Sequence, residues 1–486
     1  MDINKYLTPE VQKYIMYLIF GFVLLETLWE IYLDLRQILR HTNSEITKET
    51  EAWVTPEEFS HSNEYTITKM KFDIFKLVYS LITTAIIIFG RIYPHIWHLS
   101  VQLCSKMGVK EDSEIIHSLV FMTIQTFIEE LVALPLSYYQ TFSIEARYNF
   151  NKQTNAIFFS DFVKNLAVNI VTMLPLVAGL LSLLINHIGG DYYWLIAWFI
   201  TITFVIALQI IYPIWIMPLF NKFSPLADDD VVENITELCN ECNFPLDGLF
   251  EIDGSKRSGK SNAFFIGLCG NRRVVLFDTL VDLHRKAHLL EPKHITAIVG
   301  HEIGHSKHNH LWKRISLIFF QMFLLFFGFS VCIDTPLLYT LYGFDSNEKH
   351  AFIGILGFMF LMSPVGSIIT LLVNIFTRKF EYQADEYAAK RGYDLGTPLV
   401  ILHTENLSDL NPDPIYSWYH FSHPSLAERL EALHWKPTEN LIEKRAQWKI
   451  LKKELDDIKE QERQAKLEEM MTKSKDKPET QSDKRD

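Results

Sequence analysis

Seven apolar runs restrict what this 486-residue chain can fold into more than any other feature of its sequence. Each run is close to the roughly 20 residues that a helix needs to cross the hydrocarbon core of a bilayer. The runs occupy residues 14–33, 77–97, 115–137, 166–187, 193–218, 315–333 and 351–374. The first is too long for the apolar core of a signal peptide and lacks a small-residue cleavage site, so we expect it to be retained as a span. The sequence therefore predicts an all-α, multi-pass protein of the lipid bilayer.

The charges of the connecting loops predict the orientation of these spans. Loops 34–73 and 140–165 together carry eight Lys and Arg residues, whereas loop 98–114 carries two and loops 188–191 and 334–350 carry only Lys349. Basic loops remain in the cytosol, which leaves the N-terminus outside. The two long polar segments, 219–314 and the part after residue 374, are then both cytosolic.

Composition excludes some classes of function. The net charge is −12, and no basic stripe interleaved with aromatic residues is present, so we expect no nucleic-acid partner. The five cysteines are odd in number and dispersed along a long chain. That pattern argues against a disulfide framework and favours a reducing environment for the polar segments.

The pentapeptide HEIGH, residues 301–305, is the first motif that carries chemistry. On a helix His301 and His305 are four residues apart and share one face, where two imidazoles can hold one zinc ion. Glu302 lies beside them and can accept a proton from water. Gly300 and Gly304 are small enough for another element to pack closely against this helix.

A catalytic zinc site needs a third protein ligand, and the sequence offers a carboxylate. The pattern that would supply a third histidine fails, because position 311 is Leu and His310 is out of register. In FTRKFEYQADEYAAKRG, Glu381 and Asp385 are again four apart, so Glu381 can bind the metal while Asp385 supports a ligand histidine. Asp385 and Glu386 remain alternative ligands.

Two further stretches suggest contacts with a substrate. HFSHPSLAERLEAL contains His423, which would suit a peptidase as the donor to the developing oxyanion, and Arg429 six residues later as a further candidate. The same stretch also suits an ordinary helix start with Ser425 near the cap. SNAFFIGL and RRVVLFDTL read as two strands joined by a turn. Asn262 and Ala263 are then either the edge that holds an extended peptide or part of a plain hairpin.

These motifs, together with PLFNKFSPL, occur in one order along a chain with seven spans, and the whole resembles the type I CAAX prenyl proteases. The resemblance implies an integral-membrane zinc metalloprotease of the endoplasmic reticulum and inner nuclear membrane. It implies one zinc ion bound by His301, His305 and Glu381, with Glu302 as the catalytic base and Asp385 as support. His423, Arg429 and Asn262 would line the site. Lys260 departs from the family, which often has His there.

The resemblance also implies an activity and an architecture. The activity is removal of the last three residues from isoprenylated proteins or peptides that end in CaaX, with a second, upstream cleavage in some substrates. The architecture is a barrel of seven tilted helices around a water-filled chamber, with a cytosolic α+β zinc-protease domain. Acidic residues within the spans agree with a watery interior, since charged groups at membrane depth must face water or partners; they are Glu26, Glu30, Glu129 and Glu130.

The expected organisation has five parts. Membrane helices one to five occupy 1–218, the protease segment with the HEIGH helix 219–314, helices six and seven 315–374, the second protease segment 375–440, and a charged helix with a disordered tail 441–486. A membrane quality-control metallopeptidase that acts on unfolded segments is one alternative, which the seven spans disfavour. A channel or transporter is the other, and the lack of an internal repeat disfavours it.

Overall fold

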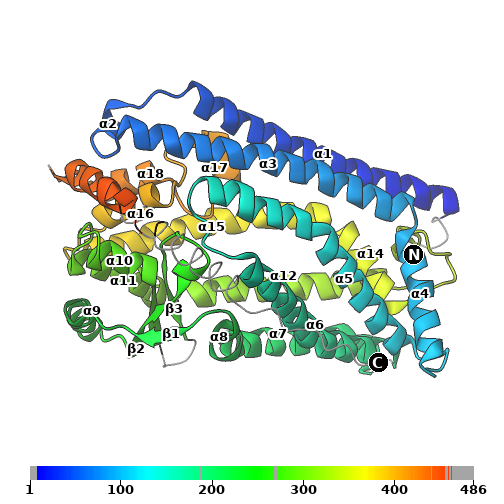
Figure 1. Cartoon of the computed structure of the whole chain (residues 1–486). Helices are drawn as coiled ribbons and strands as arrows, with labels where there is room; N and C mark the ends of the chain where they lie inside the picture. The colour runs from blue at the N-terminus through cyan, green and yellow to red at the C-terminus, as the bar shows by residue number, and fades with distance from the viewer. Residues whose placement is uncertain are drawn as a thin grey trace, which may run out of the picture.

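The computed structural model describes residues 8–186, 188–267, 272–438, 440–454, 458 and 461. Long helices lie side by side over most of the molecule, and a small sheet with shorter helices is gathered at one end (Figure 1). The long helices correspond to the apolar runs and the end with the sheet to the polar segments. The part of the chain predicted as a disordered tail lies outside the described residues from 462 onward.

Six helices among the described residues are long and apolar enough to cross a membrane. They are α1 (Pro9–Asn43), α3 (Pro56–Phe89), α5 (Glu114–Tyr139) with η2 (Gln140–Glu145), α6 (Asn155–Ile185), α7 (Tyr193–Ile211) with η3 (Gly190–Tyr192), η4 (Tyr212–Ile216) and α8 (Met217–Phe220), and α12 (His310–Cys332). A seventh candidate consists of two helices, α14 (Ala351–Leu361) and α15 (Ser363–Ala389), which are long and apolar enough only when taken together and meet at a 56° bend. The predicted multi-pass helical fold is confirmed.

The second span ends earlier than predicted, at Phe89 instead of residue 97. Gly90 closes the helix, Arg91 takes a left-handed conformation with φ of 52°, and α4 (Ile92–Lys106) begins. The Arg91 Nε donates to the carbonyl of Gly343, 2.8 Å away, just after the short helix α13 (Leu337–Thr340). A charge is costly among lipid tails, so the arginine marks the end of the span and not its middle.

Helix α1 is longer than the bilayer is thick, since 35 residues at 1.5 Å each extend about 52 Å against a hydrocarbon core of about 30 Å. Its excess length carries the buried polar residues Gln37 and His41. The Gln37 Oε1 accepts from the backbone N–H of Asp413 at 2.7 Å, and Arg36 Nη2 lies 2.8 Å from the Asp413 carboxylate. Asp413 caps α17 (Pro414–His420), which follows α16 (Gly396–Glu405). A membrane helix therefore holds the protease part directly.

The sheet has the strand order β1-β2-β4-β3. Its strands are β1 (Phe223–Pro225), β2 (Leu246–Ile252), β3 (Ala263–Ile266) and β4 (Arg272–Phe277). The two predicted strands are confirmed, because β3 pairs antiparallel with β4, with Ala263 opposite Leu276. Among the described strands β3 pairs with β4 alone, so one side of it is a free edge. The helices around the sheet are α9 (Asp229–Glu241), α10 (Asp278–Arg285) with η5 (Gly254–Lys256), and α11 (Pro292–Lys307).

The charged helix expected after residue 440 is not surrounded by solvent. Residues 441–454 are helical, and Leu441, Arg445 and Trp448, spaced on one face, are buried in the core of the protease part. The Arg445 Nη1 donates to the carbonyl of Trp53 at 2.7 Å, and its guanidinium pairs with Glu58 at the start of α3. The mixed-charge sequence did not indicate this contact, because an arginine such as Arg445 is expected at the surface unless a buried partner is known. The short helix α2 (Lys48–Glu51) precedes this contact.

Candidate metal centre

Helix α11 carries HEIGH and is almost entirely buried from His294 to Gly304. It begins at a reciprocal cap in which the Glu291 N–H donates to His294 Nδ1 at 3.1 Å. A Cβ added to Gly304 would lie 3.0 Å from the backbone of Ala384, whereas one on Gly300 would lie an ordinary 3.6 Å from Ala388. The close approach predicted for these glycines is thus made by α15, which brings its carboxylates to the histidines.

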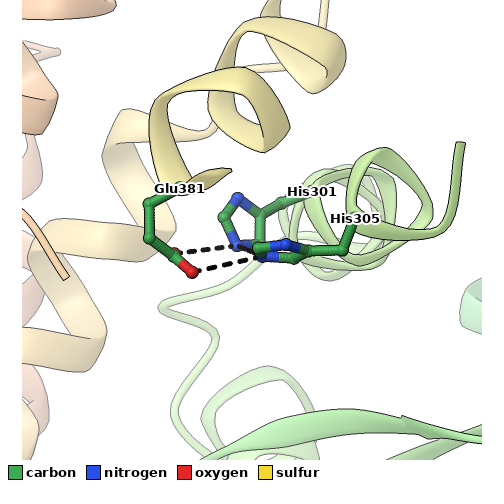
Figure 2. A group of neighbouring side chains, drawn as sticks. All are labelled: His301, His305 and Glu381. Atoms are coloured by element: carbon green, nitrogen blue, oxygen red, sulfur yellow. Dashed lines mark hydrogen bonds and ion pairs between the residues drawn. The ribbon is translucent and has the colours of Figure 1, made fainter. Parts of the chain in front are cut away.

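Three side chains meet between these helices. Figure 2 shows His301 and His305 of α11 facing Glu381 of α15. The two Nε2 atoms lie 3.1 Å apart, and the Glu381 carboxylate lies 3.5 Å from His301 Nε2 and 3.3 Å from His305 Nε2. One donor atom from each residue falls within 4.8 Å of the others. Two imidazoles and a carboxylate converging on one point suit a divalent metal ion.

Asp385 faces the other nitrogen of His301. Its Oδ1 lies 2.7 Å from His301 Nδ1, and Arg429 of α18 (Leu426–Ala432) grips the same carboxylate through Nε at 2.8 Å and Nη2 at 2.6 Å. A proton on Nδ1 leaves the Nε2 lone pair directed at the centre. The alternative ligand Glu386 points elsewhere, because its carboxylate is largely exposed and pairs with Lys390 at 2.6 Å.

Arg429, predicted among the catalytic residues, therefore lies behind the centre. Its side chain is buried, and both bonds that the structure gives it go to Asp385. This position suits support of Asp385 more than contact with an oxyanion. Sequence alone could not reveal the pairing, because the two residues are 44 positions apart.

His310 is a member of the site that the sequence reasoning missed. Its Nδ1 lies 2.9 Å from His305 Nδ1, and its Nε2 lies 2.9 Å from Gln383 Oε1. The amide oxygen can only accept, so His310 Nε2 carries the proton and His310 Nδ1 accepts from His305 Nδ1–H. This chain leaves the His305 Nε2 lone pair free for a metal. His310 is out of register for the pattern that supplies a third histidine, and its contact with His305 Nδ1 suits it to orienting that ring.

The electrostatics of α11 agree with metal ligation. Burial, with the nearby His301, lowers the pKa of His305 to about 3, which keeps the ring neutral at pH 7. Burial also lowers the pKa of His301, but its hydrogen bonds with Asp385 and Glu381 outweigh that effect and raise the pKa to about 9. A metal at Nε2 would replace the second proton, because ligation needs the neutral ring.

Glu302 and His423 lie near the three converging side chains, since Glu302 interacts electrostatically with His301, Glu381 and His423. Burial raises the pKa of Glu302, and no hydrogen bond among the described residues engages its carboxylate. His423 lies in the loop between α17 and α18 with its side chain 61% exposed, and its Nδ1 is 2.9 Å from Glu381. A carboxylate without a hydrogen-bond partner among the described residues and an exposed imidazole are thus both close to the converging side chains.

Asn262 and Ala263 lie at the start of the free edge of the sheet. Asn262 is exposed, its carbonyl accepts from the Phe277 N–H at 3.0 Å, and its Oδ1 accepts from the Ala263 N–H at 2.8 Å. Strand β3 also contacts α11. Lys260 points away from this edge, since its Nζ lies 2.6 Å from the hydroxyl of Tyr65 and 3.2 Å from Glu145. Lys260, which departs from the family pattern, thus connects this part of the chain to α3 and η2 in the membrane part.

Known families match most of the chain. A family described as the CAAX prenyl protease N-terminal region with five membrane helices matches residues 35–222, and peptidase family M48 matches residues 225–436. The "CAAX prenyl protease 1 homolog" of Arabidopsis thaliana is 36% identical over 416 residues, which cover 85% of this chain and 96% of the relative.

Two other matches cover a similar share of the chain. "CAAX prenyl protease 1" of Saccharomyces cerevisiae is 36% identical over 437 residues, covering 86% of this chain and 95% of the relative. The crystal structure of S. mikatae Ste24p superposes with a TM-score of 0.80 at 34% identity, covering 86% of this chain and 99% of the other. Identity at this level over nearly the full length of each relative shows common family membership. The chain therefore belongs to peptidase family M48, among the membrane-embedded metalloendopeptidases of the CAAX prenyl protease 1 group.

Proposed function

We propose that the protein is a zinc-dependent endopeptidase that removes the three C-terminal residues from isoprenylated CaaX proteins. The printed names of its relatives, CAAX prenyl protease 1, support this substrate class. The proposal includes a second, upstream cleavage in some substrates. It places the enzyme in the membrane of the endoplasmic reticulum and inner nuclear membrane, with the active site facing the cytosol.

One observation carries the proposal: the helix that supplies Glu381 is the continuation of the seventh span. Helix α15 leaves the apolar run near residue 374 and reaches Glu381 two turns later without a break. Since an isoprenyl chain favours an apolar environment, a lipidated C-terminus would enter beside such a helix. The five-part division of the chain belongs to the same proposal, with α15 as the covalent link between membrane and protease parts.

The donor set favours zinc over harder ions, because imidazole and one carboxylate suit Zn²⁺ whereas Mg²⁺ and Ca²⁺ take oxygen ligands. His301, His305 and Glu381 would hold the ion. Bound zinc would lower the pKa of a water molecule and polarise the scissile carbonyl. Asp385 and His310 would fix the rings of the two histidines, and Arg429 would fix Asp385.

Glu302 would move the proton. Its carboxylate accepts a proton from the attacking water and returns it to the leaving amine, while exposed His423 donates to the oxygen that becomes negative. The raised pKa of buried Glu302 brings its basicity closer to neutrality, which suits both transfers. The edge of β3 from Asn262 and Ala263 would pair with the extended backbone of the substrate.

The test is incubation of the purified full-length protein with a farnesylated CaaX peptide, followed by mass spectrometry of the products. We expect a cut directly after the farnesylated cysteine and little cutting of the same peptide without the lipid. Cleavage of unfolded, non-lipidated polypeptides with no cut in the farnesylated peptide would instead support the quality-control alternative.

A further inference from the structure

A cavity of about 670 Å³ lies where two membrane helices meet the protease part. One wall is the first three turns of α6, and the opposite wall is formed by α8 and the residues between it and β1. The loop that contains Asp253 and Lys256 closes the end nearest the sheet. The cavity lies outside the metal centre, since none of the proposed metal ligands or catalytic residues lines it.

The lining is cationic. Lys164, Lys222, Lys256 and Arg257 face two acids, Asp161 and Asp253. Arg257 and Asp161 neutralise each other through two bonds of 2.7 and 3.0 Å. The two acids therefore leave an excess of positive charge, to which the N-terminal turn of α6 adds the positive end of its helix dipole.

Of the three lysines that line the cavity, Lys222 and Lys256 have ammonium groups without a partner in the described part of the chain, whereas Lys164 has one. Lys164 Nζ donates to the carbonyl of Leu219 at 2.9 Å. Lys222 and Lys256 are exposed, and no ion pair or side-chain hydrogen bond of either ammonium group is present among the described residues. Their charges are free to bind an anion.

The position of the cavity along the helices is the second observation. The apolar run of α6 begins at residue 166, directly after the last α6 residue that lines the cavity, and the run that starts in α7 ends at residue 218 in α8, where the second wall of the cavity begins. Tyr212 and Trp215, 53% and 72% exposed, lie within two turns of the cavity on η4. Exposed Trp and Tyr collect at the level of lipid headgroups. The cavity is therefore at the membrane surface, on the side of the protease part.

We propose that this cavity binds the headgroup of an anionic phospholipid, with the phosphate between Lys222 and Lys256 and the acyl chains along Leu219 and Phe220. Basic pockets between membrane helices on the cytosolic side are suited to such headgroups. The exposed apolar side chain of Leu219 favours a lipid over a soluble anion, because a free phosphate would gain nothing from it. Free phosphate shares the headgroup chemistry, so the experiment must separate the two.

The experiment measures retention of phosphatidylglycerol by the full-length protein with native mass spectrometry, with phosphatidylcholine and inorganic phosphate as comparison probes. We expect the double variant Lys222→Gln/Lys256→Gln to bind phosphatidylglycerol about 25-fold more weakly, since each basic residue near an anionic surface contributes about fivefold. The control Lys48→Gln/Lys436→Gln changes net charge equally at two exposed lysines outside the cavity. It should bind as wild type does.

A third variant, Lys222→Arg/Lys256→Arg, keeps the charge and should retain the lipid, which separates loss of charge from loss of fold. Equal weakening in the control, or equal retention of phosphatidylcholine by wild type, would overturn the proposal. Binding of inorganic phosphate without retained phosphatidylglycerol would also overturn it, in favour of a soluble-anion site.

Discussion

At the scale of single residues, a substitution of Glu302 can remove its ability to accept a proton without changing the size of the side chain. Glu302→Gln preserves the shape of the side chain but cannot accept a proton. We expect zinc content to remain at the wild-type level and turnover to fall by about 10²-fold or more, the usual contribution of a general base. Metal analysis beside the peptide assay measures both. Activity within tenfold of wild type would mean that Glu302 is not the base.

Glu381 and Asp385 should differ in how strongly they affect the metal. Glu381→Ala removes one of three ligand groups, so zinc occupancy should fall to a small fraction of that in wild type. Asp385→Ala leaves the three donors in place but frees the His301 ring, so we expect affinity to fall by only about 10–100-fold. Zinc titration of both variants decides the order. Full occupancy in Glu381→Ala would transfer the ligand role to Asp385 or Glu386.

His310 is expected to act on the metal through His305. His310→Ala removes the acceptor at His305 Nδ1, so zinc affinity should fall by about 10–100-fold although no ligand is lost. His308→Ala is the matched control, because the His308 side chain makes ring contacts with His310 and Tyr387 but, among the described residues, no hydrogen bond to His305. Zinc titration of both variants is the measurement. Equal affinities would show that the contact between His305 and His310 has no functional weight.

These residues show how far helix periodicity extends as a guide to the site. Within α11 and within α15, a spacing of four predicts which side chains share a face, and the structure brings those two faces together. His310 was not predictable in this way, because Asn309 takes a left-handed conformation with φ of 54° and the periodicity is lost there. The role of Arg429 depends on tertiary folding alone, so no local pattern encodes it.

At the scale of elements, the crossing of α11 and α15 sets the geometry of the metal centre. Gly304→Ala would place a methyl group 3.0 Å from the backbone of α15, which cannot yield as a side chain can. We expect the helices to separate, with a loss of about 1–3 kcal/mol in stability and lower zinc content.

Gly300→Ala, one turn away on α11, is the control for that substitution. Its methyl group would make only ordinary contacts of 3.6 Å or more, and alanine favours a helix over glycine by about 1 kcal/mol. Stability should therefore be unchanged or slightly raised. Thermal unfolding and metal analysis of both variants provide the test. Equal stability and equal zinc content of the two variants would show that α11 and α15 can move apart at their crossing without harm to the metal centre.

The sequence predicted which elements exist better than where they end. The length of an apolar run identifies a membrane span, because the free-energy cost of exposing unpaired backbone groups to lipid is the same whatever the rest of the fold. The ends depend on tertiary partners: Arg91 finds the carbonyl of Gly343, and α15 starts a new direction at Pro364, whose ring cannot continue the hydrogen bonds of α14. The docking of Arg445 depends on Glu58, 387 positions away, and has no local signal.

At the scale of the whole molecule, few residues in the most apolar parts of the spans are fully buried. In the most apolar stretch of each of the six long helices, only 6–17% of the residues are buried. A dry bundle would bury the inward stripe of each helix, which is roughly three residues in seven. The low burial favours a hollow arrangement, and we infer that the predicted barrel encloses water.

Glu26 and Glu30 of α1 allow this inference to be tested. They share a face of the helix and have polar partners on the protein side, because Glu26 accepts from the Ser367 hydroxyl of α15 and Glu30 lies 3.0 Å from His420 Nε2. Leu24 and Leu28 share the opposite face, about 200° away at 100° per residue, and both are exposed. If water fills the interior, one face of α1 is wet and the other is in lipid.

Single cysteines at these four positions, treated with a small, charged, membrane-impermeant thiol reagent, should therefore divide into two pairs. We expect Glu26→Cys and Glu30→Cys to be labelled in the folded protein in its membrane, because a charged reagent can follow water to them. Leu24→Cys and Leu28→Cys should stay protected, since the reagent does not enter hydrocarbon. Labelling of all four after denaturation controls for thiol reactivity. Equal protection of all four in the folded protein would mean a dry bundle, in which the carboxylates are satisfied only by Ser367 and His420 and the path of a substrate to Glu381 would have to lie outside the barrel.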